Sequence, residues 1–180
     1  MKNLTVNVGP MFSGKTTALQ QQGIKHMKAK HKTIFLKPFF DNRYSDGYIV
    51  SHDGFKVPAI NIDDTLLLPQ VLESDVILID EIQFLPELII KDLWKLINLG
   101  KTIYCSGLDM DYKGNGFDTT MKTMAMADQV NKFTAICKVC GKDATMSCKK
   151  DENGQRVELG HEDIYFPTCK ECFIKERKSD

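Results

Sequence analysis

Residues 9–16 read Gly9-Pro10-Met11-Phe12-Ser13-Gly14-Lys15-Thr16. It matches the phosphate-binding pattern G-x-x-x-x-G-K-[ST] at every fixed position. Glycines at both ends let the backbone curl, so that successive N–H groups point at phosphate oxygens in front of a helix N-terminus. We expect all eight residues to bind ATP, with Lys15 reaching the β- and γ-phosphates and the Thr16 hydroxyl binding Mg²⁺.

The residues on either side have the patterns of a strand and a helix. Residues 4–8 alternate apolar and polar side chains, as a short strand with one apolar face does. From Thr16 to about His31 most residues favour helix, and Thr33–Leu36 is a second β-rich run. This context predicts a βαβ unit with parallel strands and the first strand inside the sheet. A surface turn with a chance lysine, the competing interpretation, would not require it.

The totals restrict the class of protein. A chain of 180 residues can form one ordinary core with a small appended module. Lysine plus arginine equals aspartate plus glutamate at 24 each, so there is no global basic field to hold nucleic acid or a membrane surface. No signal-peptide core is visible, and the apolar runs are shorter than a membrane span. We expect a soluble, cytoplasmic protein that binds neither nucleic acid nor membrane.

An acidic motif follows a second predicted strand. Val76–Ile79 is a continuous apolar run, typical of a strand buried on both faces, and it ends in Asp80 and Glu81. Asp80 is expected to hold the hydration shell of Mg²⁺ beside the phosphate loop. Glu81 is then free to act as general base on the group that attacks the γ-phosphate. A solvated acidic pair at a strand end is the alternative.

The other elements are marked less sharply. Residues 39–58 are interpreted mostly as a loop with a short strand near Tyr48–Val50. A helix capped by Asp63 or Asp64 is expected to end near residue 73. Further along we expect a helix that begins at Pro86 and ends at Gly100, and a strand at 102–105 in which Cys105 is a buried hydrophobe. Residues 106–117 should form a segment on the ligand side of the sheet. A helix that packs Met121, Met124 and Met126 into the core and a last strand around 130–136 should follow.

Four of the six cysteines form two Cys-x-x-Cys pairs, Cys137 with Cys140 and Cys169 with Cys172. Four thiolates suit a tetrahedral structural Zn²⁺ that has no open position for catalysis. The 28 residues 141–168 between the pairs exceed the usual ribbon insert, so we expect a long loop whose feet are held by zinc. A redox dithiol and disulfides remain alternatives, and Cys148 is a weak substitute ligand.

These patterns together predict an α/β fold with two parts. The first, residues 1–135, is a P-loop, RecA-like domain with a parallel sheet that binds ATP. The second, residues 136–180, is a small zinc-ribbon-like domain that carries the long loop.

Several runs resemble a known family. They are Gly-Pro-Met-Phe-Ser-Gly-Lys-Thr at 9–16, Lys-Pro at 37–38, Asp-Asn-Arg-Tyr-Ser at 41–45, Asp-Glu-Ile-Gln-Phe at 80–84, Gly-Leu-Asp at 107–109, and Tyr165 four residues before Cys169. The chain resembles the zinc-containing thymidine kinases of bacteria, animals and some viruses. The resemblance implies transfer of the ATP γ-phosphate to the 5′-hydroxyl of thymidine or deoxyuridine, giving dTMP and ADP for pyrimidine salvage.

The resemblance also implies roles for individual residues. Glu81 looks like the general base, and Asp80 and Gln83 look like part of the phosphate and Mg²⁺ environment. Asp41 and Arg43 look like a second phosphate-side motif, although spacing alone fits a solvated ion pair equally well. The implied nucleoside-binding residues are Met11, Phe84, Leu108, Tyr112, Phe117, Arg156, Val157, Glu158, Leu159, Gly160 and Tyr165.

In that family the loop between the cysteine pairs closes over the nucleoside as a lasso, and residues 156–160 are the matching stretch here. Two departures from the family's pattern affect this site. Gly160 is followed by His161 where a second glycine is common, and Tyr112 replaces a common phenylalanine. A side chain at a position that favours φ > 0 makes the lasso geometry the least secure part of the resemblance.

The resemblance further implies a homotetramer and dTTP as a feedback inhibitor. The chief alternative is a P-loop ATPase that uses Glu81 to activate water and the zinc ribbon to bind nucleic acid. The zero net charge disfavours it, because proteins that follow a phosphate backbone usually have a clustered basic surface. A non-enzymatic zinc adaptor gives no reason for Lys15 or for Asp80 and Glu81.

Overall fold

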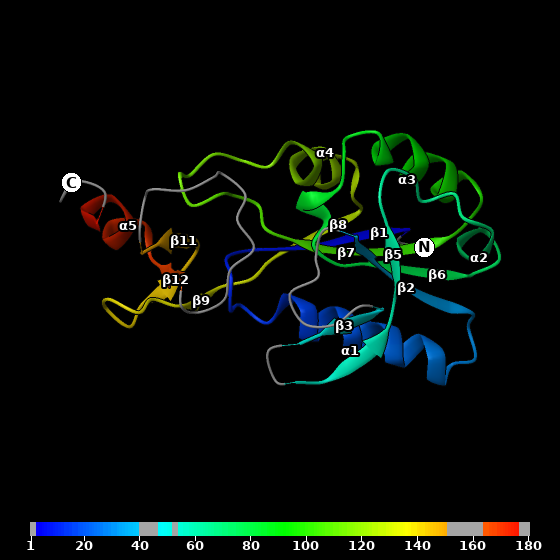
Figure 1. Ribbon diagram of the computed structural model, residues 1–180, viewed down its shortest axis with the longest axis horizontal. Coiled ribbons are helices and arrows are strands. Elements are labelled where there is room, and N and C mark those ends of the chain that lie inside the picture. The colour runs from blue at the N-terminus through cyan, green and yellow to red at the C-terminus, as the bar shows by residue number, and fades with distance from the viewer. Residues whose placement is uncertain (1–2, 40–46, 52–53, 151–163, 177–180) are drawn as a thin grey trace.

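A six-stranded parallel sheet forms the centre of the protein (Figure 1). The computed structural model describes residues 3–39, 47–51, 54–150 and 164–176. The strands of the sheet are β1 (Leu4–Val8), β2 (Thr33–Pro38), β5 (Ile60–Ile62), β6 (Val76–Ile79), β7 (Thr102–Gly107) and β8 (Gln129–Lys132), in the order β5-β2-β6-β7-β1-β8. Every neighbouring pair in this sheet runs parallel.

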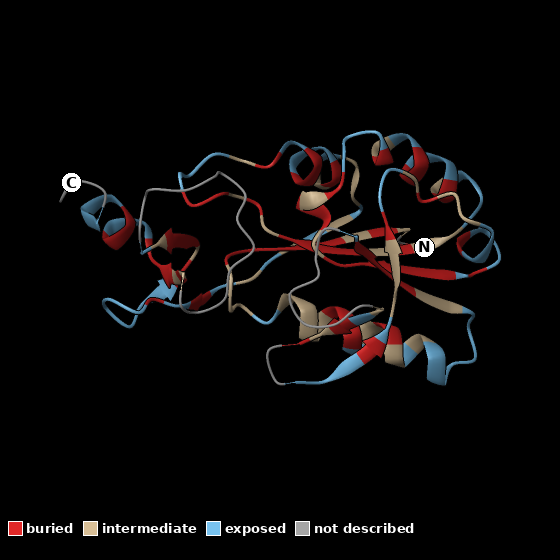
Figure 2. Ribbon diagram, viewed as in Figure 1, coloured by how far each residue is buried: buried red, intermediate tan, exposed pale blue. Residues whose placement is uncertain are grey.

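Helices cover both faces of the sheet. Helix α1 (Lys15–Lys28) lies on one face, and α3 (Ile89–Asn98) and α4 (Asp118–Met126) lie on the other (Figure 1). The central strands β1 and β6 are therefore buried on both faces, and their Leu, Val and Ile side chains are almost fully excluded from water (Figure 2). The predicted βαβ unit with an interior first strand is confirmed, with β6 and β7 lying between β1 and β2.

A short hairpin packs against α1. It consists of β3 (Tyr48–Val50) and β4 (Lys56–Pro58), which pair antiparallel. The buried Gln20 side chain of α1 donates hydrogen bonds to the carbonyl oxygens of Ile49 at 3.0 Å and Phe55 at 3.1 Å. This amide ties the hairpin to the helix, because one buried NH₂ group bonds carbonyl oxygens at two points of the hairpin.

The C-terminal part contains two small antiparallel sheets and a helix. Their elements are β9 (Ala135–Ile136), β10 (Asp143–Ala144), β11 (Met146–Lys149), β12 (Tyr165–Thr168) and α5 (Lys170–Glu176). Strand β9 pairs with β10, and β11 pairs with β12. They lie beyond one end of the central sheet (Figure 1).

The predicted helix over about residues 63–73 is wrong, because only α2 (Pro69–Leu72) is helical in this stretch. The buried Asp92 carboxylate accepts hydrogen bonds from the Thr65 hydroxyl at 2.9 Å and the Leu66 N–H at 3.0 Å, which holds residues 65–66 in an extended connection. Pro69 then supplies the first helical residue, where a missing N–H costs nothing.

Other boundaries also differ from the predictions. The strand expected around 130–136 is divided between β8 and β9, which belong to different sheets. Strands β4 and β5 fall where no strand was predicted. The helix expected to open at Pro86 begins three residues later, as α3. Pro86 itself lies between the 3-10 helix η1 (Ile82–Phe84), which precedes it, and a turn, which follows it. Cys105 is fully buried, as expected, but Met121 of α4 is exposed. In the described part of the chain, no helix combines the length and apolar character needed to cross a bilayer.

Candidate active site

The parallel arrangement brings the chemically active segments to one edge of the sheet. The phosphate loop follows β1, Asp80 follows β6, and Leu108 follows β7. Because parallel strands all point the same way, these carboxyl ends meet at a single edge, where open α/β sheets bind ligands. Among the described residues, the phosphate loop and Asp80 therefore lie together even though they are far apart in the sequence.

The phosphate loop depends on unusual backbone conformations. Gly9 has a φ of 144° and Gly14 a φ of 82°. A Cβ on Gly9 would lie 2.4 Å from the carbonyl oxygen of Phe133, so both space and conformation require glycine there. Phe12 at the apex has a φ of 64° although it carries a side chain. The loop is thus curled as a phosphate-binding loop must be.

Lys15 folds back over this loop. Its Nζ donates to the carbonyl oxygen of Pro10 at 2.6 Å and to the Ser13 hydroxyl at 3.3 Å. The Ser13 hydroxyl also donates to the Pro10 carbonyl at 2.8 Å. A phosphate oxygen is a stronger acceptor for an ammonium group than a neutral carbonyl, so the cation is placed to transfer to phosphates at the mouth of the loop.

Thr16 and Asp80 meet as predicted. The Thr16 hydroxyl donates to one Asp80 carboxylate oxygen at 3.0 Å, and the other oxygen lies 3.4 Å away. Asp80 is 5% exposed, and its N–H continues the ladder of β6 by donating to Leu36. Hydroxyl and carboxylate oxygens are the ligands that Mg²⁺ prefers, so this pair fits a magnesium ion between the first turn of α1 and the end of β6.

Glu81 takes a left-handed conformation, with φ 51° and ψ 42°. Non-glycine residues in this region cost about 1 kcal/mol or more and are concentrated at functional sites. The Gln83 side chain donates to the Glu81 carboxylate from its Nε2. The Gln83 Oε1 accepts from the Leu108 N–H at 3.0 Å, which ties the acidic motif to the segment that follows β7.

The aromatic residues predicted for the nucleoside side come partly together. The rings of Tyr112 and Tyr165 are both buried, and their centroids are 6.4 Å apart. The Lys149 ammonium lies 5.4 Å from the centre of the Tyr112 ring. Phe84 and Phe117 lie at the end of η1 and at the start of α4, two elements that pack on each other.

Two buried aspartates, Asp109 and Asp111, shape the segment after β7. Only Asp109 belongs to a motif noted in the sequence, Gly-Leu-Asp at 107–109. Asp109 is 7% exposed and forms an ion pair with Lys132 at 2.8 Å. Asp111 accepts hydrogen bonds from the N–H groups of Lys113 at 2.9 Å and Asn115 at 2.8 Å, which closes a tight turn. The Asp-x-Lys-Gly-Asn-Gly composition is the signal that could have revealed this turn.

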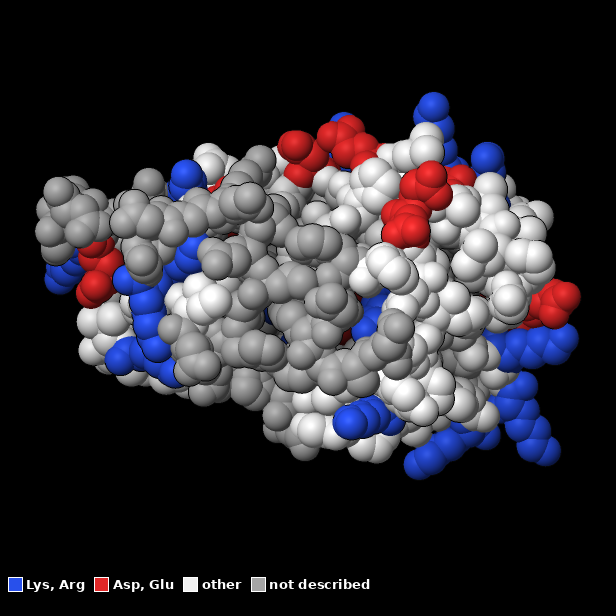
Figure 3. Space-filling view, viewed as in Figure 1, with Lys and Arg blue, Asp and Glu red and all other residues white. Residues whose placement is uncertain are grey.

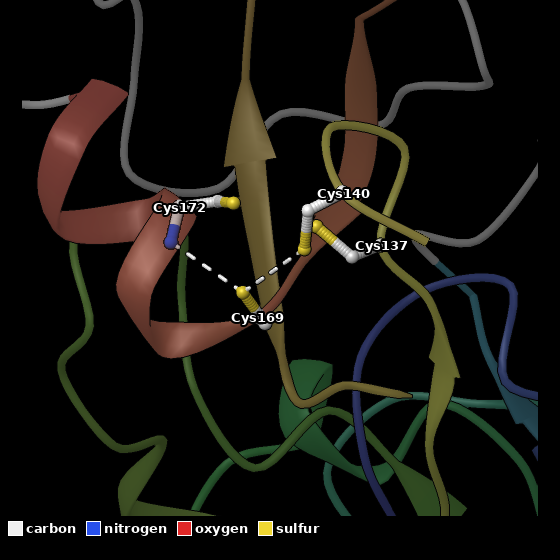
Figure 4. Close-up of side chains that lie close together, drawn as sticks. All are labelled: Cys137, Cys140, Cys169 and Cys172. Carbon is white, nitrogen blue, oxygen red and sulfur yellow. Dashed lines mark hydrogen bonds between the residues drawn. The ribbon is translucent and has the colours of Figure 1, made fainter. Parts of the chain in front are cut away.

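The four paired cysteines converge (Figure 4), and their sulfur atoms all lie within 4.8 Å of one another. Burial raises the pKa of Cys137, but hydrogen bonds from the backbones of Cys169, Cys140 and Val139 outweigh it and lower that pKa to about 6. The side-chain hydrogen bond with Cys169 and burial raise the pKa of Cys172 to about 12. With the four sulfur atoms so close together, deprotonating a further thiol is unfavourable. A bound divalent cation would stabilise the additional thiolate. The cluster fits a Cys₄ zinc site.

The cysteine-containing part contacts the phosphate loop directly. The Met11 N–H donates to the Ser147 hydroxyl of β11 at 3.1 Å. The Lys138 ammonium, between Cys137 and Cys140, lies 5.9 Å from the centre of the Phe12 ring. Sequence reasoning missed both contacts, because no local pattern relates residues so far apart in the chain.

Some predicted site residues lie outside the described residues. They are Asp41 and Arg43 of the second phosphate-side motif and Arg156, Val157, Glu158, Leu159 and Gly160 of the lasso.

Known proteins are similar to this chain over nearly its whole length. A family model described as Thymidine kinase matches residues 2–173. A Thymidine kinase of Pseudothermotoga lettingae is 34% identical over 175 residues, which cover 96% of this chain and 95% of that protein. A Thymidine kinase of Bacteroides thetaiotaomicron is 38% identical over 178 residues, covering 98% and 89%. A Thymidine kinase of Pyrobaculum aerophilum is 34% identical over 182 residues, covering 95% and 98%.

Ser147→Ala should weaken ATP binding about fivefold, because the Met11 N–H loses its acceptor and the apex of the loop is no longer fixed. Titration calorimetry with ATP measures this. Ser74→Ala is the matched control, since Ser74 is equally buried but its hydroxyl bonds Gln70 far from the loop. Equal ATP affinity in the two variants would contradict a role for Ser147 in the phosphate loop.

Proposed function

The chain belongs to the thymidine kinase family and is an ATP-dependent phosphotransferase, and we propose that it uses Glu81 as the general base. The hydrogen bond between Thr16 and Asp80 carries this proposal. It fixes the end of β6 beside the phosphate loop, so that Glu81, the next residue, stands next to the bound γ-phosphate. A base in that position can activate an alcohol acceptor.

Each group of residues has a separate part in the proposed reaction. The N–H groups of residues 9–16 and the Lys15 ammonium bind and orient the ATP phosphates. Glu81 accepts the proton of the thymidine 5′-hydroxyl as the bond from O5′ to the γ-phosphorus forms and the bond from that phosphorus to ADP breaks. When bound between Thr16 and Asp80, Mg²⁺ supplies positive charge to the phosphate oxygens.

We propose that the nucleoside lies on the other side of Glu81. Met11, Phe84, Leu108, Tyr112, Phe117 and Tyr165 are the proposed contacts among the described residues. The approach of Tyr112 to Tyr165 supports a flat binding surface, since aromatic faces pack well against a pyrimidine ring. Residues 156–160 would close over the ring as a lasso, and Asp41 and Arg43 would act on the phosphate side. Deoxyuridine is proposed as a second substrate.

The cysteine cluster is proposed to bind one structural Zn²⁺ in a small domain that starts at residue 136 and follows an ATP-binding domain of residues 1–135. Reduced cysteines and the use of ATP both favour a cytoplasmic location. Assembly as a homotetramer and feedback inhibition by dTTP complete the proposal, supported only by the family resemblance.

A nucleotide assay tests the function. ADP release from ATP and Mg²⁺ should rise when thymidine or deoxyuridine is added and should not rise when single-stranded DNA is added. On the face shown in Figure 3, the described acidic side chains lie in the upper part and at both margins, and basic side chains lie among them at the top as well as at the left and lower right, so the two charges are mixed there. Stimulation by DNA without stimulation by thymidine would favour the nucleic-acid ATPase instead.

Glu81→Gln should lower kcat by about a hundredfold or more while ATP affinity changes less than about twofold, because it removes a base but no phosphate contact. Single-turnover phosphate transfer and ATP titration measure the two effects. Glu87→Gln is the control, since the partly exposed Glu87 pairs with Lys122 on the surface. Near-normal turnover of Glu81→Gln would assign the base to another residue.

Metal analysis of the purified protein should find one zinc per chain. Cys140→Ser should lower that content and the melting temperature, because metal binding contributes to folding. Cys148→Ser is a suitable control, since Cys148 bonds Thr168 and lies outside the cluster. A fold that stays intact without zinc would exclude a structural role for the metal.

A further inference from the structure

Gln83 occupies a position between the acidic motif and the segment after β7. The side chain is 7% exposed. Its Nε2 donates to the Glu81 carboxylate, and its Oε1 accepts from the Leu108 N–H at 3.0 Å. One amide group therefore connects the proposed base to the backbone of the nucleoside side.

The chemistry of the two partners fixes the orientation of this amide. A carboxylate can only accept hydrogen bonds, and a backbone N–H can only donate one. A flipped amide would place its oxygen against the Glu81 carboxylate and its NH₂ against the Leu108 N–H, which would lose both bonds and add repulsion. Gln83 is thus locked, and its donor is aimed at Glu81.

Gly107, the last residue of β7, provides the space for this amide. A Cβ on Gly107 would lie 2.6 Å from the Gln83 Oε1 and 2.7 Å from the Ile82 Cγ2. Gly107 is not among the glycines with positive φ, so backbone conformation does not require glycine here. The requirement is for space, because Ile82 is fully buried and has no room to move away.

We propose that Gln83 is a positioning residue that aims the Glu81 carboxylate at the acceptor hydroxyl and ties that aim to the backbone of Leu108. Gly107 permits the arrangement by lacking a side chain. This role rests on Glu81 being the proposed base. It differs from the role that family resemblance assigns to Gln83, which is a contact in the phosphate and Mg²⁺ environment.

Replacing Gln83 with methionine leaves the charged neighbourhood of Glu81 unchanged. Asp80 precedes it in the chain, and Lys15 lies on the phosphate loop. The elements packed on η1 are β2, β7 and α4, and their titratable residues are Lys37, Tyr104, Cys105, Asp118 and Lys122. A change in the pH dependence of Gln83→Met can then be assigned to the lost hydrogen bonds and not to a changed charge.

The experiment is the pH profile of kcat for Gln83→Met, which keeps the length of the side chain but removes both its donor and its acceptor. A carboxylate that loses a donor binds its proton more tightly, so the acidic limb should move to higher pH by about one unit. At neutral pH kcat should fall about tenfold, with the KM for ATP nearly unchanged. Gln83→Glu should move the limb further, because two carboxylates then face each other.

Gly107→Ala tests the same arrangement from the other side and should move the limb in the same direction. Gln20→Met is the matched control, since it removes another buried amide that holds only the β3–β4 hairpin. It should lower the melting temperature and leave the profile in place. In the Glu81→Gln background, Gln83→Met should cause no further loss of rate.

Each failure has a distinct result. An active Glu81→Gln variant would remove the proposed base, and with it the premise. A Glu81→Gln variant without activity, together with identical pH profiles for Gln83→Met and Gln20→Met, would overturn the positioning role alone. A Gln83→Met variant that changes the Mg²⁺ dependence and leaves the acidic limb unmoved would assign Gln83 to the metal.

Discussion

The hydrogen bond between Thr16 and Asp80 is the constraint on which the site depends. It joins the first turn of α1 to the end of β6, two segments that are separate in the sequence. Asp80 is also held by the sheet, because its N–H donates to Leu36 at 3.0 Å. The position of Glu81 follows from this, and through Gln83 so does its link to the segment after β7. A shift of either end would move the phosphate loop and the proposed base Glu81 relative to each other, and catalytic geometry tolerates little of that.

Two residues with side chains take left-handed conformations here, Phe12 with a φ of 64° and Glu81 with a φ of 51°. Each costs about 1–2 kcal/mol relative to ordinary backbone, so the surrounding contacts must hold it in place. For Glu81 a contact is the Gln83 amide, and for Phe12 it includes the ammonium of Lys138. At both positions the chain takes a direction that regular strand or helix geometry would not give it.

Local patterns predicted the parts of the structure that depend on neighbouring residues. The phosphate loop, the buried strand ending in Asp80 and the two cysteine pairs all follow from fixed spacing and a clear apolar run. The helix near residues 63–73 failed because the distant Asp92 binds Thr65 and Leu66, and no pattern shows such a partner. The bonds of Ser147 and Gln83 were missed for the same reason, since each depends on how folded segments meet.

The hydrogen bond from Met11 to Ser147 also bears on how the protein is made. Chains are synthesised from the N-terminus, so Met11 in the phosphate loop leaves the ribosome 136 residues before Ser147 does. Its partner on β11 follows only after the whole central sheet has been produced. Ribosomes add about 5–20 residues per second, so several seconds separate the two events. During that interval the nascent chain holds a phosphate loop without its partner, and the later synthesis of β11 supplies it.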